Sequence, residues 1–294
     1  MSAAATEATR VPGAPLAPAK LRHRPGTPTV LRWELRKLRS QKRTYLGLGA
    51  AVVFPLLFVI LSSSRHGHPG DTPFSAYVRE TGLAAPLLML FFGSGFLFPL
   101  IAALVSGDII ANEDGNGTLK TILTRSVDRG QVFAGKLAAA AVYTTVGLFT
   151  AMLTALIAAS LAFGLHPIIT FSGTFVSSGK GLKLVFFAYL VYLIPMLTVS
   201  AIALLLSAAT RNSAASVVGT LVFVLLEELV TIIPGLGGLS PYILPTLFQA
   251  WQGFLRVPTD WAPIGHAAWV CAVYSVPAAF AAYLVFLRRD VTGG

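Results

Sequence analysis

Long runs of apolar residues, separated by shorter polar segments, dominate the pattern of this chain. Six of the runs are long enough to cross a bilayer as helices, because roughly 20 apolar residues span its hydrocarbon core. The pattern therefore predicts an all-α integral membrane protein with six transmembrane helices. We place these spans at about 45–62, 83–106, 137–164, 183–206, 213–233 and 265–287.

A shorter amphipathic pattern precedes the first span. The Thr-Pro pair at 27–28 is a helix-start signal, and Leu31, Leu35 and Leu38 share one face of the helix that follows. Basic residues lie mostly on the other faces, as in a helix that rests in the headgroup layer. We therefore predict an interfacial helix within 27–44. The alternative is a basic stretch that only sets the orientation of the first span.

The stretch before the last span also interrupts the pattern. Its apolar part, about 240–256, is too short to cross the membrane, so we predict a re-entrant segment on the outer side. One helical face of it would hold Leu247, Phe248, Trp251, Phe254 and Leu255.

Composition and charge place the chain in the membrane. Hydrophobic residues make up 55% and charged residues 12%, whereas soluble domains carry about 25% charged residues. With the N-terminus inside, 17 of the 22 Lys and Arg residues fall on the cytoplasmic side, which is a positive-inside pattern with both termini in the cytoplasm. No basic groove with interleaved aromatic residues is present, so we expect no nucleic-acid partner.

The chain divides into three parts on this basis. Residues 1–26 are rich in Ala, Pro and Thr and lack the apolar core of a signal peptide, so we expect a disordered cytoplasmic tail. The amphipathic helix occupies 27–44, and the six-span transmembrane domain occupies 45–294.

Motifs of enzymes and metal sites are absent from the sequence. The stretch from Gly173 to Lys180 departs from a phosphate-binding loop, because five residues separate its glycines and no Ser or Thr follows the lysine. Cys271 is the single cysteine, which we interpret as a buried hydrophobe. His66 and His68 fit a solvated loop better than a metal site. We expect no catalytic residue, no metal and no cofactor bound by this chain.

Two adjacent carboxylates lie inside the predicted fifth span. Intramembrane acids are costly, so Glu227 and Glu228 are candidate pathway or gate residues. Adjacent helical residues point about 100° apart, so at most one can easily face a central pathway. The alternatives are a pair hydrogen-bonded within the bundle or near the outer headgroups, and a proton-coupling site.

The cytoplasmic segment between spans two and three predicts a short helix parallel to the membrane. Leu119, Ile122 and Leu123 give it an apolar face, and Asp128 can cap the helix that becomes span three. One interpretation is an ordinary structured loop. The other is a lever through which a soluble partner moves two membrane helices.

The motifs in this segment resemble the ABC-2 type of ABC transporter permease. They are Glu113 followed by Gly117-Thr118-Leu119, then 125–129, then Gly135-Lys136-Leu137, at the spacing of the family. Ser126 and Asp128 stand where the family usually has Pro and Ser, and Asp128 keeps the capping chemistry. Further matches are the elbow-helix segment Trp33, Glu34, Leu35, Arg36 and Lys37, and the re-entrant segment that begins at Ser240-Pro241-Tyr242.

The resemblance implies a permease subunit of an ATP-driven exporter in the bacterial plasma membrane. Such a permease pairs with a second copy or a paralogue, and two separate ABC ATPase subunits bind ATP and Mg. A coupling helix at about 113–126 would dock into the ATPase. The implied coupling residues are Glu113, Gly117, Thr118, Leu119, Ile122, Leu123, Arg125, Asp128 and Arg129.

Two other classes of function stay open at this point. One is a proton-coupled secondary transporter that uses Glu227 or Glu228, and the other is a membrane scaffold or sensor. Neither class needs a docking helix.

Overall fold

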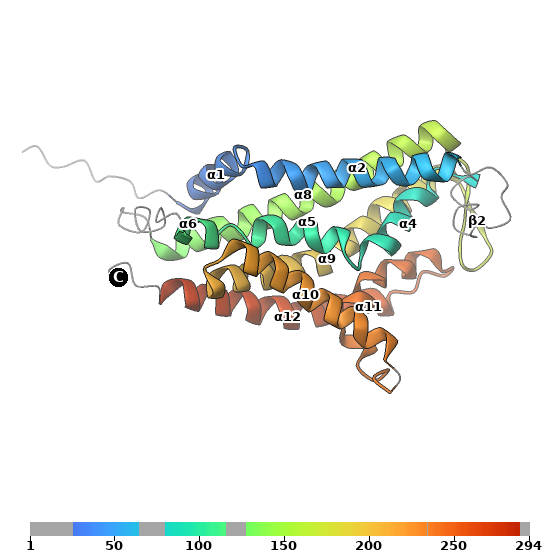
Figure 1. Ribbon diagram of the computed structural model, residues 1–294. Coiled ribbons are helices and arrows are strands. Elements are labelled where there is room, and N and C mark those ends of the chain that lie inside the picture. Colours follow the sequence, from blue (N-terminus) through green and yellow to red (C-terminus); the bar gives the residue numbers. More distant parts are fainter. Residues whose placement is uncertain (1–25, 65–79, 116–127, 234, 289–294) are drawn as a thin grey trace, which may run out of the picture.

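The structure, a computed structural model, describes residues 26–64, 80–115, 128–233 and 235–288. Helices dominate it, as the apolar runs predict (Figure 1). The helices are α1 (Thr27–Leu38), α2 (Lys42–Ser64), α4 (Ala84–Gly93), α5 (Leu97–Ser106), α6 (Ala111–Gly115), α8 (Arg129–Phe163), α9 (Ser178–Thr210), α10 (Ser213–Ile232), α11 (Leu244–Phe248) and α12 (Ala262–Leu287).

Five of these helices are long and apolar enough to cross a membrane, namely α2, α8, α9, α10 and α12. The bent pair α4–α5 makes a sixth crossing if it is counted as one span. The prediction of an all-helical membrane protein is confirmed at this level. Helices α8 and α9 have 35 and 33 residues, so each is roughly 50 Å long and extends beyond a hydrocarbon core of about 30 Å.

The predicted span 83–106 is broken rather than continuous. Helices α4 and α5 meet at an angle of 66°, and residues 94–96 form the break. Pro86 and Pro99 each lie in the first turn of their helix, where a missing N–H costs little. The sequence has Gly93-Ser94-Gly95 at this break, between two apolar stretches that together have the length of one span.

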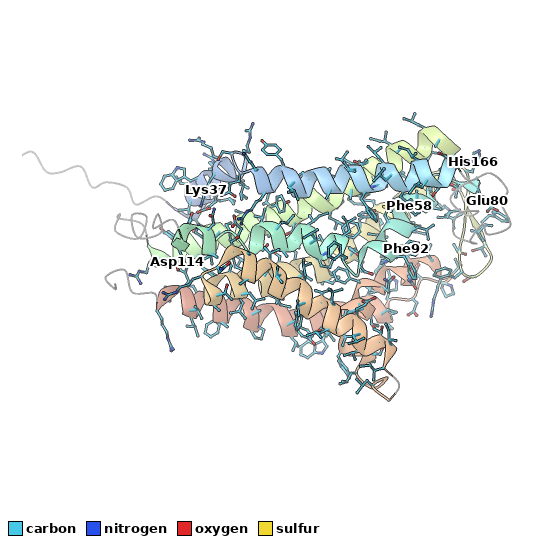
Figure 2. All side chains as sticks on the ribbon, viewed as in Figure 1. Lys37, Phe58, Glu80, Phe92, Asp114 and His166 are labelled. Atoms are coloured by element: carbon cyan, nitrogen blue, oxygen red, sulfur yellow. The ribbon has the colours of Figure 1, made fainter. Side chains whose placement is uncertain are left out.

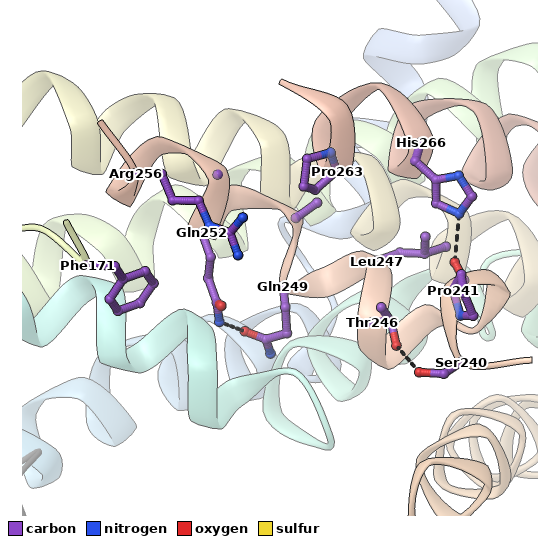
Figure 3. Close-up of a pocket in the computed structure, with 12 residues that line it drawn as sticks. Phe171, Ser240, Pro241, Thr246, Leu247, Gln249, Gln252, Arg256, Pro263 and His266 are labelled. Atoms are coloured by element: carbon purple, nitrogen blue, oxygen red, sulfur yellow. Dashed lines mark hydrogen bonds between the residues drawn. The ribbon is translucent and has the colours of Figure 1, made fainter. Parts of the chain in front are cut away.

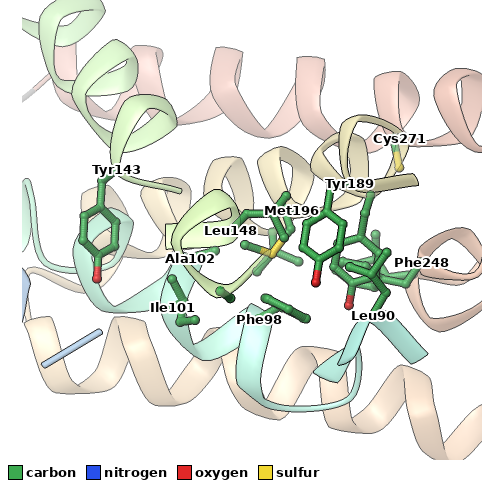
Figure 4. Close-up of a cluster of buried hydrophobic side chains, with 14 of the residues drawn as sticks. Leu90, Phe98, Ile101, Ala102, Tyr143, Leu148, Tyr189, Met196, Phe248 and Cys271 are labelled. Atoms are coloured by element: carbon green, nitrogen blue, oxygen red, sulfur yellow. The ribbon is translucent and has the colours of Figure 1, made fainter. Parts of the chain in front are cut away.

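Helix α9 forms the centre of the bundle and contacts α12, α5, α10 and α8. Tyr189 and Met196 of α9 pack with Phe98 of α5 and Phe248 of α11 in the main apolar cluster (Figure 4). Hydroxyl groups join the same helices, since the Ser106 and Ser200 oxygens lie 2.6 Å apart. Small hydroxyl residues at such positions let membrane helices pack closely.

The two ends of the bundle differ in structure (Figure 1). Helices α1 and α6 and the last turn of α12 lie at one end, which we name the α1 end. The other end, the hairpin end, carries a two-stranded antiparallel hairpin of β1 (Ile168–Ile169) and β2 (Phe175–Val176), with Ile168 opposite Val176.

The segment predicted as re-entrant consists of three short helical pieces at the hairpin end. They are a 3₁₀ turn at Ser240–Tyr242, helix α11, and a 3₁₀ helix at Ala250–Leu255. Leu247, Phe248, Trp251 and Leu255 are buried, and Phe254 is partly buried. The predicted apolar face therefore packs into the bundle, chiefly against α9, α10 and α12.

Candidate functional site

Helix α1 carries a carboxylate in the middle of its buried face. Val30, Glu34 and Leu38 are buried at a spacing of four residues, whereas Trp33 and Arg36 on the other faces are exposed. Leu35 is partly buried. Helix α1 begins at the predicted Thr-Pro start signal with Gly26 as its N-cap, and it ends at Leu38, before the end of the predicted range 27–44.

A glycine lets α1 approach α8 closely. A Cβ atom at Gly135 would lie 2.6 Å from the Cγ1 atom of Val30, which is closer than carbon atoms pack. The side chain after this glycine, Lys136, is fully buried and points into the contact. The Gly-Lys pair at the start of α8 therefore combines a close contact with a buried charge.

Lys136 forms the centre of a buried ionic cluster. Its Nζ atom lies 2.8 Å from Oε1 of Glu34 and 2.6 Å from Oε2 of Glu113, and it also donates to the Ile109 carbonyl at 3.3 Å. Lys37 of α1 pairs with the other oxygen of Glu113. We name Glu34, Lys37, Glu113 and Lys136 the ionic cluster. It joins α1, α6 and α8 at the α1 end.

The charges of the ionic cluster balance. Burial alone would raise the pKa of the Glu113 carboxyl, but the ammonium groups of Lys136 and Lys37 outweigh it and hold the pKa below its usual value of 4.5. Two carboxylates therefore face two ammonium groups in a largely closed space. Removal of the fully buried Lys136 from this set costs about 3–5 kcal/mol, because uncompensated charges stay behind.

A second set of polar contacts joins further helices to the α5–α6 turn. Asp108 pairs with Arg43 at the start of α2 and accepts a hydrogen bond from Ser213 at the start of α10. Arg211, at the end of α9, lies 3.7 Å from Asp114. Figure 2 shows Lys37 and Asp114 at the same end of the bundle, far from Glu80 and His166.

Most of the predicted coupling helix lies outside the described residues. This applies to Gly117, Thr118, Leu119, Ile122, Leu123 and Arg125. Asp128 occupies the N-cap position of α8 as predicted, but its side chain accepts no capping hydrogen bond from the first turn. Arg129 donates to the Leu287 carbonyl at 2.9 Å, so the start of α8 contacts the end of α12.

The two adjacent carboxylates of α10 have different surroundings at the hairpin end. Oε2 of Glu227 accepts a hydrogen bond of 2.9 Å from the backbone N–H of Leu244, and its side chain is buried. Glu228 instead faces a cavity of about 490 Å³, which we name the Glu228 cavity. Residues that line it include Phe91, Phe92, Ser94, Glu228, Thr246 and Gln249.

A smaller cavity of about 290 Å³ adjoins the first one (Figure 3). The two cavities share Ser240, Thr246 and Gln249. Gln249 accepts a hydrogen bond of 2.8 Å from Gln252, and a ring nitrogen of His266 lies 2.9 Å from the Pro241 carbonyl oxygen. The segment 240–249 therefore contributes polar side chains to both cavities.

Sequence reasoning missed the pairing of Glu34 with Lys136, although it singled out both segments. The available signal was a glutamate on the apolar side of an amphipathic helix and a lysine just inside an apolar run. Both need a partner when buried. The two residues are 102 positions apart, so only the folded chain shows that they meet.

The fold and this arrangement define a multi-pass membrane protein with a charged cluster at one end. Residues 30–227 match the model of the ABC-2 family transporter proteins, so the chain belongs to that family. The chain is also similar to the probable ABC transporter permease protein NosY of Stutzerimonas stutzeri, with 40% identity over 62 residues. That stretch covers 21% of this chain and 22% of the relative.

Proposed function

We propose that this chain is the permease subunit of an ATP-driven exporter and forms the substrate pathway together with a second permease copy or a paralogue. Membership of the ABC-2 family supports a permease subunit. Two separate ABC ATPase subunits would bind ATP and Mg and perform hydrolysis. This chain would supply the pathway and the contact that receives the motion.

The ionic cluster is the observation that carries the coupling part of the proposal. Glu113 lies two residues before Gly115, the last described residue before the gap at 116–127, and it forms ion pairs with Lys37 of α1 and Lys136 of α8. A displacement of the segment after Glu113 would therefore act on two helices at once. Asp108 and Asp114 extend the same linkage to α2 and to the α9–α10 turn.

The orientation follows from the charge distribution. The α1 end would face the cytoplasm of a bacterial cell, because the basic residues of the chain gather in the segments assigned to that side. Helix α1 and the last turn of α12 lie at this same end, which agrees with an even number of crossings (Figure 1). The Glu228 cavity would then lie near the outer surface of the plasma membrane.

The family match gives no support to a proton-coupled secondary transporter that uses Glu227 or Glu228. The contacts give each acid another role. Glu227 accepts a hydrogen bond from the backbone N–H of Leu244 at the start of α11, and Glu228 lines a cavity.

The proposal is tested by capture of the tagged chain from detergent-solubilised native membranes, followed by ATPase assay and mass spectrometry. We expect an ABC ATPase to co-purify with the intact chain and to be lost from the variants Leu119→Asp and Ile122→Asp. A matched control is Leu239→Asp, because Leu239 is exposed at the opposite end of the bundle. Absence of an ATPase from the intact chain, or equal loss from the control, would overturn the proposal.

A further inference from the structure

The Glu228 cavity opens where α4 and α5 break. The position of a Cβ atom on Gly95, inside the break, lies 3.8 Å from Oε1 of Glu228, so the carboxylate stands directly against the gap between the two helices. A continuous helix with larger side chains would fill part of this space. The broken span thus creates room for a ligand beside an acidic group.

The Glu228 carboxylate is incompletely satisfied. Its Oε2 atom is buried and has no hydrogen-bond partner among the residues that the structure describes. Within the same part of the chain, no Lys, Arg or His side chain forms an ion pair with it. The fully buried Tyr192 hydroxyl lies within electrostatic range of Glu228 and is likewise unpartnered there. A partly buried carboxylate without a counter-charge favours a cationic ligand.

The aromatic lining favours an organic cation over a metal ion. The rings of Phe91 and Phe92 meet at an interplanar angle of 90° with centroids 5.2 Å apart, so they form a corner of two apolar faces. Aromatic rings attract organic ammonium groups through their electron-rich faces. No group of three His, Cys, Asp or Glu side chains suited to a metal ion occurs in the described ranges.

We propose that the Glu228 cavity binds the ammonium group of an amphipathic molecule, with Glu228 as its counter-charge and Phe91 and Phe92 as its aromatic walls. The hydroxyl and amide groups of Ser94, Thr246 and Gln249 complete a polar floor that can accept the ammonium N–H or its bound water. Phe96 follows Gly95, a residue of the cavity lining, and its exposed ring offers an apolar surface for the tail of the molecule.

An amphipathic ammonium ion in this cavity would be the cargo of the proposed exporter. Its transport rests on the proposed function, whereas its binding does not. Binding itself needs no ATPase, so its failure is distinct from a failure of ATPase capture. An ammonium group can come from a free amphipathic cation or from the headgroup of phosphatidylethanolamine. The chemistry at Glu228 is the same for both, and the lipid composition of the assay separates them.

The test measures binding of radiolabelled hexylammonium, a primary ammonium ion, to the full chain in nanodiscs of digalactosyldiacylglycerol, a lipid without an ammonium group. Labelled hexyl sulfate serves as the anionic control. We expect saturable binding of the cation only, and at least about tenfold weaker binding by Glu228→Gln, because its neutral amide supplies no counter-charge.

Glu227→Gln makes the same change one residue away and should bind like the intact chain. Phe92→Leu keeps an apolar wall without the ring, and should weaken binding about two- to fivefold.

Nanodiscs that contain phosphatidylethanolamine identify the source of the ammonium group. If the lipid is the natural ligand, it competes with the probe, and native mass spectrometry finds it retained by the intact chain and lost from Glu228→Gln. If the ligand is a free cation, the lipid leaves probe binding unchanged. The proposal is overturned if the intact chain binds the cation and the sulfate equally or neither of them. Unchanged binding by both Glu228→Gln and Phe92→Leu would overturn it as well.

Discussion

Glu34 of α1 and Lys136 of α8 are 102 positions apart in the chain, yet they form a buried ion pair of 2.8 Å. Lys136 also contacts Glu113, so one ammonium group joins the helix before the first span, the segment after the bent span, and the start of the longest helix. Removal of the Lys136 ammonium group would therefore affect all three of these segments. This relationship underlies the account of coupling and leads to the first three predictions.

Substitution of Lys136 should destabilise the fold strongly. In Lys136→Met the carboxylates of Glu34 and Glu113 lose their shared partner, so we expect a loss of about 3–5 kcal/mol in the free energy of unfolding. Lys37→Met is the matched control, because the Lys37 side chain is 35% exposed and its loss should cost only about 0–1 kcal/mol. Denaturant unfolding in detergent measures both. Equal losses in the two variants would contradict a central role for Lys136.

The close contact of α1 and α8 predicts a specific steric effect at Gly135. A side chain there meets Val30, so Gly135→Ala should destabilise the protein by about 1–3 kcal/mol through overpacking. Val30→Ala should restore part of the loss when the two are combined. Gly49→Ala in α2 is the control, because a Cβ atom there meets nothing within 4 Å. Thermal unfolding of the four proteins is the measurement, and absence of rescue in the double variant would contradict the contact.

The lowered pKa of Glu113 predicts loss of stability in acid. Its folded-state pKa lies below the ordinary value of 4.5, so its contribution to stability is fully present above that value and is lost as the pH falls through the folded pKa. The melting temperature of the intact chain should therefore fall below about pH 4.5 more steeply than that of Glu113→Gln, which has already lost the ionised group. Parallel curves for the two proteins would contradict the assignment.

Glu227 should act as a structural acceptor. In Glu227→Leu the Leu244 N–H loses its partner, and an unsatisfied buried amide costs about 1–3 kcal/mol. Glu227→Gln keeps an oxygen that can accept the same hydrogen bond and should lose less. Thermal unfolding distinguishes the two, and an equal loss would show that the charge of Glu227, rather than the hydrogen bond, matters.

Much of the fold could be predicted from the sequence, because apolar runs of membrane length have few alternative structures. The predicted spans overlap α2, α8, α9, α10, α12 and the α4–α5 pair. Helix α8 begins directly after Asp128, the residue predicted to cap it, and so starts eight residues before the predicted span. Helix α9 starts five residues before its predicted span, since polar residues such as Ser178 continue a helix beyond the hydrocarbon core. The break near Gly95 was missed, although Gly93-Ser94-Gly95 is a turn signal, because the apolar residues on both sides together have the length of one span.

The candidate site was only partly predictable. Glu227 and Glu228 stood out as acids in an apolar run, and the angle between adjacent helical residues indicated that one of them at most faces a pathway. Which one does so depends on α11, whose Leu244 N–H takes Glu227 as its acceptor. The coupling residues 117–125 lie outside the described part of the chain, so their role stays a prediction.

The central claim, a permease that works with separate ATPase subunits, is tested most directly by the native mass of the complex purified from its own membranes. The account predicts an assembly of two permease chains, each of 31.1 kDa or one replaced by a paralogue, with two copies of an ABC ATPase. A permease chain that purifies without any ATPase, under conditions that preserve the helical bundle, would contradict it.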